Sequence, residues 1–378
     1  MTTVTDPPIP RVGTDIKFID GTTMWGDGLD ALRATAAAGL EGVNYRTLDE
    51  LSPTLDHAYL GDVAALADEL GLYVQMGVGK VNPYMTAELP RVRDLGRGSY
   101  VRGMERMIET AAAFGWTECW SAVGGFKPYP GLYFTDRFRR EAPWPDQLAA
   151  TAELLRRLAP ALRANGVRID LETHEEITTV ELLRLIETVG DDVIGICLDP
   201  ANLFVRAELP DEAVARIAPY VHSTQLRDAV LITGDDGTIS RFLAPCGDGL
   251  IDWDDLLAVL LTHQPDLPLT IEGIGAMRAE MRLFPGDPVW DAGHPDLTAQ
   301  TLDRLRALAE GYTARARRGD VPDETDLRGE RPPFMGVDEF VARSAAHLRE
   351  RLRALASNAL PASARATPPH DIPKEIRP

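Results

Sequence analysis

The sequence predicts an α/β protein, a (β/α)8 TIM barrel followed by a C-terminal helical extension. Short β-rich runs alternate with longer amphipathic helical stretches, which is the pattern of a parallel sheet built from βαβ units. Eight such runs can be counted, as a closed barrel requires. The first run continues into Gly-Thr-Thr-Met-Trp-Gly-Asp-Gly, which lacks the phosphate-turn spacing of a doubly wound open sheet.

The predicted elements follow one another in regular order. The eight strands are predicted at 14–20, 42–46, 72–78, 118–123, 168–174, 193–199, 221–227 and 267–273. Apolar residues at helical spacing predict the intervening helices at 29–38, 60–70, 100–114, 147–164, 179–189, 211–217 and 254–261, and an eighth at 297–316.

The pattern changes after about residue 320, where Pro and charged residues become frequent. We therefore expect the barrel domain to span residues 1–318. A linker and helical extension, with one amphipathic helix at 337–355, is expected over 319–360. The Pro- and Ala-rich stretch 361–378 is predicted to be disordered. The extension could cover the barrel floor or mediate oligomerisation.

Composition excludes several classes of partner. The 378 residues include 39 Lys and Arg against 58 Asp and Glu, a formal net charge of −19, so nucleic acid and anionic membranes are not expected as main partners. Three scattered cysteines, Cys119, Cys197 and Cys246, do not form a disulfide framework or a zinc motif. Neither a membrane span nor a targeting segment is evident, so a soluble cytoplasmic protein is expected.

Four consecutive predicted strands end in oxygen-bearing side chains. Glu172, Asp199, Gln225 and Glu272 close strands five to eight, and the carboxyl ends of barrel strands converge on one patch. Three carboxylates crowded there would repel one another unless a cation neutralised them. An all-oxygen set favours Mg²⁺ or Mn²⁺ over zinc. The structural alternative is that these residues are strand-end caps and salt-bridge partners.

The same stretches carry a family resemblance. The chain resembles the xylose isomerase-like barrels, the sugar phosphate isomerase/epimerase superfamily, in Asp-Leu-Glu-Thr-His (170–174), Cys-Leu-Asp-Pro-Ala-Asn-Leu (197–203), Gln-Leu-Arg-Asp (225–228), Gly-Asp-Gly-Leu-Ile-Asp-Trp (247–253) and Thr-Ile-Glu-Gly (270–273). The resemblance implies a Mn²⁺- or Mg²⁺-type site held by Glu172, Asp199, the strand-seven residue and Glu272. It also implies proton transfer beside a carbonyl, with Glu172 and Glu272 as the acid/base pair.

The chain departs from the family pattern at two positions. The family often has His-x-Lys-Asp where this chain has Gln225-Leu226-Arg227-Asp228. His222 is a tempting substitute, but it lies three residues earlier, about 10 Å down the strand and on the opposite face, so Gln225 is preferred. Glutamine here resembles the dehydratases that act on 3-dehydroshikimate. Asn202 stands where epimerases and those dehydratases usually have histidine.

Further residues are predicted to reach the site. His174 shares a strand face with Glu172 and is a rival base, because its pKa suits neutral pH. Asn202, Tyr45 and Lys80 are candidate substrate-binding residues. Arg227 could bind an anionic or hydroxyl group, or simply pair with the adjacent Asp228.

The segment 116–144 is rich in aromatic residues. It could form a lid or stack on a sugar or flat ring, or it could be a self-packed loop or a subunit interface. Its aromatic residues are Trp116, Trp120, Phe126, Tyr129, Tyr133, Phe134, Phe138 and Trp144. An aryl-bearing substrate would point to lyases of the superfamily such as the catalytic subunits of C-glycoside deglycosidases, which need a small partner subunit.

The leading functional hypothesis is a metal-dependent isomerase or epimerase acting on a keto sugar or sugar derivative through an enediolate. A lyase on the same scaffold is the first alternative, acting on a 3-keto-glycoside or a cyclic keto acid. A barrel that binds without catalysis is the second. The expected partners are a small carbohydrate substrate and further copies of the chain in a homo-oligomer.

Overall fold

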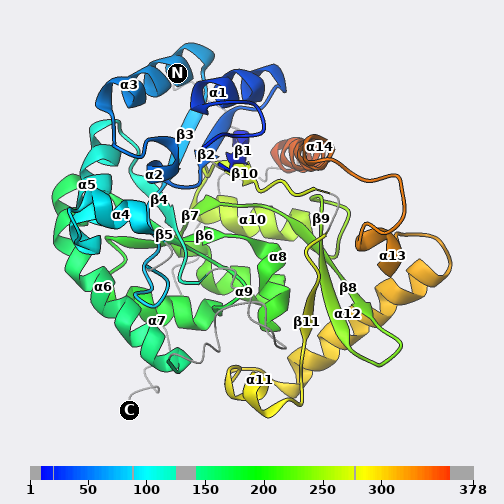
Figure 1. Cartoon of the computed structure of the whole chain (residues 1–378). Coiled ribbons are helices and arrows are strands. Elements are labelled where there is room, and N and C mark those ends of the chain that lie inside the picture. Colours follow the sequence, from blue (N-terminus) through cyan, green and yellow to red (C-terminus); the bar gives the residue numbers. More distant parts are fainter. Residues whose placement is uncertain (1–9, 20, 87–88, 125–141, 276–277, 358–378) are drawn as a thin grey trace, which may run out of the picture.

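The computed structural model describes residues 10–19, 21–86, 89–124, 142–275 and 278–357, and its centre is a parallel barrel (Figure 1). The sheet order is β10-β1-β2-β3-β4-β5-β6-β7, and a parallel bridge between Leu226 and Ile271 closes the seam between β7 and β10. The predicted (β/α)8 fold is therefore confirmed. Its strands are β1 (Val12–Ile16), β2 (Gly42–Tyr45), β3 (Tyr73–Gly77), β4 (Glu118–Ser121), β5 (Arg168–Glu172), β6 (Ile194–Leu198), β7 (Val221–Thr224) and β10 (Leu269–Ile271).

The first strand starts and ends earlier than predicted. β1 pairs with β10 from Val12 onward and leaves the sheet after Ile16, whereas the prediction ran from 14 to 20. Ile19 pairs with Thr22 in a turn and is 76% exposed. Its β-branched side chain, typical of strands, led to the wrong prediction that the strand continues to residue 20. Lys17 is consequently a residue at the barrel mouth rather than one inside a strand.

The predicted helices surround the barrel and begin at identifiable caps. The Asp27 side chain accepts hydrogen bonds from the backbone at the start of α1, and Thr178 and Glu181 form a capping box on α7. The long helices around the barrel bury apolar residues in the core that they share with the strands. The helices over the first part of the chain are α1 (Gly28–Ala37), α2 (Leu48–Leu51), α3 (His57–Leu70), α4 (Pro90–Leu95), α5 (Tyr100–Ala113), α6 (Trp144–Asn165), α7 (Thr179–Val189), α8 (Pro200–Leu203), α9 (Pro210–Ile217) and α10 (Trp253–His263).

The C-terminal helices have different partners from those expected. The predicted eighth helix is present as α12 (Ala299–Arg317), but it packs on a small second sheet instead of on the barrel strands. The predicted extension helix is α14 (Val337–Ser357), which contacts β1, β10 and α10 and buries Phe340 and Leu348. α14 thus takes the place of an eighth barrel helix. The short helix α11 (Pro288–Ala292) precedes α12, and α13 (Glu324–Leu327) lies between α12 and α14. The tail 361–378 lies outside the described residues.

A three-stranded antiparallel sheet follows β7 and was not predicted. It consists of β8 (Asp228–Thr233), β9 (Ile239–Ala244) and β11 (Met281–Leu283), in the order β11-β9-β8. Val230, Ile232 and Phe242 pack with Tyr312 of α12 in a cluster of their own. Because β8 begins directly after the end of β7, this sheet rises from the barrel mouth (Figure 1).

No helix within the described ranges combines the length and the apolar character that a membrane crossing needs. The three cysteines are buried and free.

Candidate active site

Three carboxylates from three strands meet at the carboxyl end of the barrel. Glu172 is the last residue of β5, Asp199 follows β6, and Glu272 follows β10. One carboxylate oxygen of each lies within 4.8 Å of the others. Oxygen ligands sit about 2.0–2.6 Å from Mg²⁺ or Ca²⁺, so oxygens this close can surround a single divalent ion. The donor set therefore fits the predicted kind of cation.

Asp199 is held in place by the start of α8. Its Oδ1 accepts a hydrogen bond from the backbone N of Ala201 at 3.0 Å, and Pro200 occupies the first helical position. The Thr173 hydroxyl donates to the Asp199 carbonyl oxygen at 2.8 Å. These bonds leave Oδ2 for contacts within the site. Burial raises the pKa of Asp199 to about 6, although Arg227 opposes the shift.

Glu172 is surrounded by neutral donors. Trp120 Nε1 donates to Oε2 at 3.2 Å, and Asn202 Nδ2 donates to Oε1 at 3.3 Å. Asn202 was predicted near the site and lies in it, three residues after Asp199 on α8. Burial raises the pKa of Glu172 to about 8, against the opposing charge of His174.

Glu272 has cationic neighbours instead. Lys17 Nζ lies 2.6 Å from Oε1, and Arg227 Nη2 lies 2.8 Å from Oε2. Burial favours the neutral acid, but Arg227 and then Lys17 outweigh it and lower the pKa of Glu272 to about 2. Two glutamates on opposite sides of one site thus have pKa values shifted in opposite directions.

Arg227 is buried within the carboxylate cluster. Its Nε donates to Asp199 Oδ2 at 2.9 Å, its Nη2 contacts the same oxygen, and it also pairs with Glu272. Of the two predicted roles, pairing with Asp228 is wrong. The Asp228 carboxylate instead accepts from backbone and indole donors, including Trp253 Nε1 at 2.8 Å.

Gln225 follows β7 directly, whereas the predicted strand continued to residue 227. Its backbone N donates to the Leu198 carbonyl at 2.9 Å, and the residue is 2% exposed. Among the described residues, no hydrogen bond engages its side-chain amide. The amide oxygen therefore stays a candidate fourth ligand.

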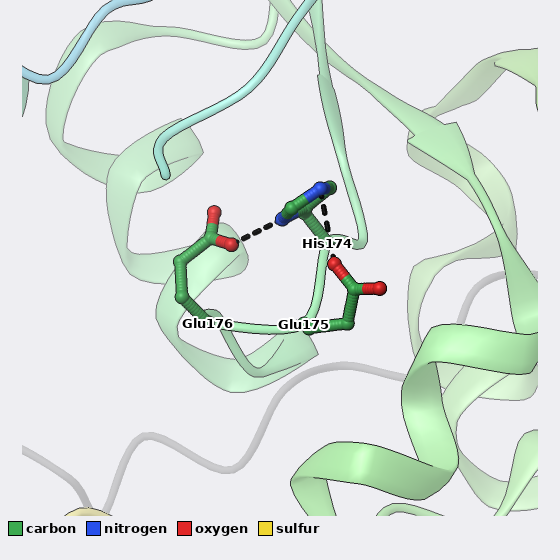
Figure 2. Close-up of side chains that lie close together, drawn as sticks. All are labelled: His174, Glu175 and Glu176. Atoms are coloured by element: carbon green, nitrogen blue, oxygen red, sulfur yellow. Dashed lines mark hydrogen bonds and ion pairs between the residues drawn. The ribbon is translucent and has the colours of Figure 1, made fainter. Parts of the chain in front are cut away.

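His174 belongs to a second cluster, together with Glu175 and Glu176 (Figure 2). Its Nε2 lies 3.0 Å from Glu175 Oε2, and its Nδ1 pairs with Glu176 Oε2. Burial alone would lower the pKa of His174, but Glu175 and Glu176 outweigh it and hold that pKa well above its usual range. Both ring nitrogens face carboxylates, which is the arrangement of a fixed imidazolium rather than of a free base.

Tyr45 and Lys80 lie apart from the three carboxylates. Tyr45 is fully buried, and its hydroxyl donates to the Gly28 carbonyl at 2.6 Å, so the side chain lies between β2 and α1. Lys80 Nζ donates to the Gly124 carbonyl, near Glu176 of the second cluster. Tyr45 is thus placed for packing, and Lys80 belongs beside the His174 cluster.

Most of the predicted aromatic segment lies outside the described residues. This part is residues 125–141, with Phe126, Tyr129, Tyr133, Phe134 and Phe138. Of the remaining members, Trp120 contacts Glu172, Trp144 starts α6 and donates to Glu181 at 3.0 Å, and Trp116 stacks on Phe114.

Lys17 and Arg241 were not predicted at the site, and Trp120 was predicted only as a member of the aromatic segment. Lys17 contacts Glu272, Trp120 contacts Glu172, and Arg241 of β9 lies 3.3 Å from Glu175. Arg241 is fully buried and arrives from the unpredicted sheet. If β1 had been predicted to end at Ile16, Lys17 would have been a candidate site residue, because the other candidates were chosen for their position at the ends of strands.

His222 is remote from this cluster, and replacing it should affect stability more than activity. Its Nδ1 lies 3.3 Å from Gln264 Nε2, and burial, with Arg168 nearby, lowers its pKa to about 4. We expect His222→Ala to lower the free energy of unfolding by about 1–2 kcal/mol in a urea titration and to leave turnover within about twofold. A folded but inactive variant would show that the residues of β7 are wrongly assigned to the site.

Comparison with known proteins agrees with this architecture. The family described as xylose isomerase-like TIM barrel matches residues 32–308. A 3-oxo-isoapionate decarboxylase from Pectobacterium atrosepticum is 24% identical over 251 residues, which cover 65% of this chain and 77% of that protein.

Two solved structures share the fold. An L-ribulose 3-epimerase superposes with a TM-score of 0.56 at 18% identity, covering 95% of this chain and all of that one. A xylose isomerase-like TIM barrel protein from Mycobacterium smegmatis, in complex with magnesium, superposes with a TM-score of 0.51 at 15% identity. The superposition covers 81% of this chain and 97% of that one. Because the family match spans well over half of the sequence, the chain belongs to the xylose isomerase-like TIM barrel family.

Proposed function

We propose that this protein is a divalent-metal-dependent enzyme that removes a proton beside the carbonyl of a keto sugar or sugar derivative, as an isomerase or epimerase. The observation that carries the proposal is the convergence of Glu172, Asp199 and Glu272, with oxygens within 4.8 Å of one another at the barrel mouth. Epimerases among the fold neighbours support the sugar substrate. Mn²⁺ and Mg²⁺ are the cations we favour, since all the donors are oxygen.

The cation would be held by Glu172, Asp199 and Glu272, with the Gln225 amide oxygen as the fourth protein ligand. When bound, it would polarise the substrate carbonyl and stabilise the enediolate. The protein's own groups divide the proton transfer between them. Glu272, which Lys17 helps to keep ionised, would accept the proton from carbon. Glu172 would be the other member of the acid/base pair, taking up and returning a proton once the cation has bound.

His174 is given no base role in this proposal. Its ring nitrogens are both engaged by carboxylates, so a proton would first have to leave the cluster. We assign it instead to the support of the mouth, where its charge opposes the rise in the pKa of Glu172. Asn202 orients Glu172 through the 3.3 Å hydrogen bond from its amide.

A lyase is the second candidate, and the similarity to a decarboxylase favours it. Loss of CO2 from a 3-oxo acid sends the electron pair of the broken C–C bond toward the ketone oxygen. The resulting enolate needs the same stabilisation as an enediolate and then takes a proton from an acid such as Glu172. Cleavage of a 3-keto-glycoside or dehydration of a cyclic keto acid would begin with the same proton removal.

One experiment separates the two candidates. Metal-loaded protein is incubated in D2O with a panel of ketohexoses, and in parallel with 3-oxo sugar acids, 3-keto-glucosides and 3-dehydroshikimate. Deuterium at the carbon beside the carbonyl, without cleavage, would support the isomerase or epimerase. Release of CO2 or aglycone, or dehydration, would support the lyase. No reaction with any compound by metal-loaded protein would favour the non-catalytic barrel.

Metal binding should release protons, and its affinity should rise with pH. In the metal-free protein the pKa of Glu172 is about 8 and that of Asp199 about 6, so at pH 7 Glu172 is largely protonated. A carboxylate must lose its proton to bind a cation. We expect roughly one proton released per Mn²⁺ at pH 7 and fewer above pH 8. Calorimetric titrations in buffers of different ionisation enthalpy measure this number, and a value near zero at pH 7 would contradict the assignment.

The biological setting stays a prediction. A cytoplasmic location and a homo-oligomer remain as expected from the sequence, and a small partner subunit belongs to the C-glycoside lyase alternative.

A further inference from the structure

Arg227 lies where the ligand oxygens converge. Its guanidinium donates through Nε to Asp199 Oδ2 at 2.9 Å and lies 2.8 Å from Glu272 Oε2 through Nη2. The side chain is only 7% exposed. Two of the three carboxylates that would hold a cation therefore already hold one, supplied by the protein itself.

The other partners of these carboxylates differ from Arg227. Trp120, Asn202 and the Ala201 backbone are neutral donors, which leave the negative charge of Glu172 and Asp199 available to an ion. Lys17 is charged, but it binds the opposite oxygen of Glu272 and is shared with Asp15, at 34% side-chain exposure. Within the described ranges, Arg227 is the charged group that bridges two of the candidate ligands.

We propose that Arg227 is an exchangeable internal cation, which neutralises the ligand carboxylates in the metal-free protein and must leave Asp199 and Glu272 when a divalent ion binds. This inference rests on the proposed metal site. A metal ion would bind the same two oxygens at about 2.0–2.6 Å. A guanidinium nitrogen within hydrogen-bond distance of both would then face a doubly charged ion at close range, where like charges repel strongly.

The exchange has consequences in both states. Without metal, Arg227 keeps the buried carboxylates of Asp199 and Glu272 from repelling one another, which stabilises the folded barrel mouth. With metal, the cost of moving Arg227 is subtracted from the binding free energy, so the wild-type protein holds its ion more weakly than the same ligands would alone. Arg227 thereby sets the metal concentration at which the site fills.

Metal affinity of matched variants tests the proposal. Mn²⁺ is titrated into metal-free wild type, Arg227→Gln, Arg227→Lys and Lys17→Gln, and free Mn²⁺ is measured by EPR. We expect Arg227→Gln to bind Mn²⁺ at least about tenfold more tightly than wild type, since the competing charge is gone. Arg227→Lys, which keeps the charge, should stay nearer to wild type, and Lys17→Gln should change affinity by less than about threefold. Without metal, Arg227→Gln should melt below wild type, and Mn²⁺ should raise its Tm by more.

A second measurement uses the wild type alone, in case the variants fold poorly. In wild-type protein saturated with diamagnetic Mg²⁺, the NMR resonance of the Arg227 Nε–H group should shift, because its hydrogen bond to Asp199 Oδ2 is lost. An unchanged resonance in the Mg²⁺-saturated protein would overturn the proposal.

The affinity results also separate this proposal from the metal site itself. Equal or weaker binding by Arg227→Gln, with tight binding by wild type, would overturn the exchange and leave the metal enzyme standing. Binding by Arg227→Gln but not by wild type would support the exchange and contradict metal dependence in the natural chain. If neither binds Mn²⁺, both proposals fail.

Discussion

Replacing either Glu172 or Glu272 with glutamine is expected to lower kcat/KM by at least about a thousandfold. Glutamine keeps the size of the side chain but neither holds a transferable proton nor supplies a negative charge to a cation. Glu272→Gln additionally leaves Lys17 and Arg227 without one of their carboxylates. Exchange of the substrate proton with D2O, followed by NMR, measures the loss directly.

Glu118→Gln is the matched control for these variants. Glu118 begins β4, at the opposite end of the barrel from the mouth, and pairs with Arg168 at 3.4 Å. The same chemical change there should leave kcat/KM within about threefold of wild type. If a folded Glu172→Gln or Glu272→Gln kept more than about a tenth of wild-type activity, that glutamate would not be part of the acid/base pair.

Replacing Asp228 with alanine is expected to cost about 3–5 kcal/mol of unfolding free energy. Its buried carboxylate accepts hydrogen bonds from five donors, four of them backbone groups: Ala229 N, Gly247 N, Leu250 N, Ile251 N and Trp253 Nε1. Alanine would leave these donors without their acceptor in a dry environment. Urea unfolding of the two proteins gives the difference.

Trp253→Phe provides a graded comparison. It removes a single donor, at 2.8 Å from Oδ2, while the ring stays buried at the start of α10. A cost of about 1–2 kcal/mol is expected, clearly below that of Asp228→Ala. If Asp228→Ala cost less than Trp253→Phe, the carboxylate would not organise the loop of residues 247–253.

Gly249 of the same loop lies close to Asp228, since a Cβ atom on it would clash with the Asp228 carboxylate and the Ala229 carbonyl.

The strand-end residues could be predicted because barrel geometry places them together whatever the loops do. Glu172, Asp199 and Glu272 follow three different strands, and parallel strands in a closed barrel bring their carboxyl ends to one rim. An error of one or two residues in a strand boundary did not move these residues away from the rim. All eight barrel strands overlap their predicted ranges because each contains one of the short β-rich runs on which the prediction was based.

Features that depend on side-chain direction or loop path could not be predicted in this way. Tyr45 is the last residue of β2, as Glu172 is the last residue of β5, yet the Tyr45 side chain points outward to α1. The preceding residue, Asn44, is buried on the other face of β2. Glu175 and Glu176 enclose His174 only because the chain turns immediately after β5. Neither outcome follows from residue spacing alone.

The three-stranded sheet was not predicted, although the sequence of its first two strands indicates a hairpin. Two β-rich runs, β8 and β9, flank Gly234-Asp235-Asp236-Gly237, a sequence typical of a hairpin turn. Predicting that hairpin would have brought Arg241 toward the site and assigned α12 to a partner outside the barrel. α14 would then have been the remaining helix to complete the barrel wall.

The most direct test of the account is the metal content of the purified protein. After loading with Mn²⁺ and removal of free ion by gel filtration, elemental analysis should find about one metal per chain, and Tm should rise relative to the chelated protein. Asp199→Asn, which changes one ligand and keeps its shape, should lower that content. Less than about 0.3 metal per chain in the wild type, with an unchanged Tm, would contradict a divalent-metal enzyme and favour a barrel that binds without metal chemistry.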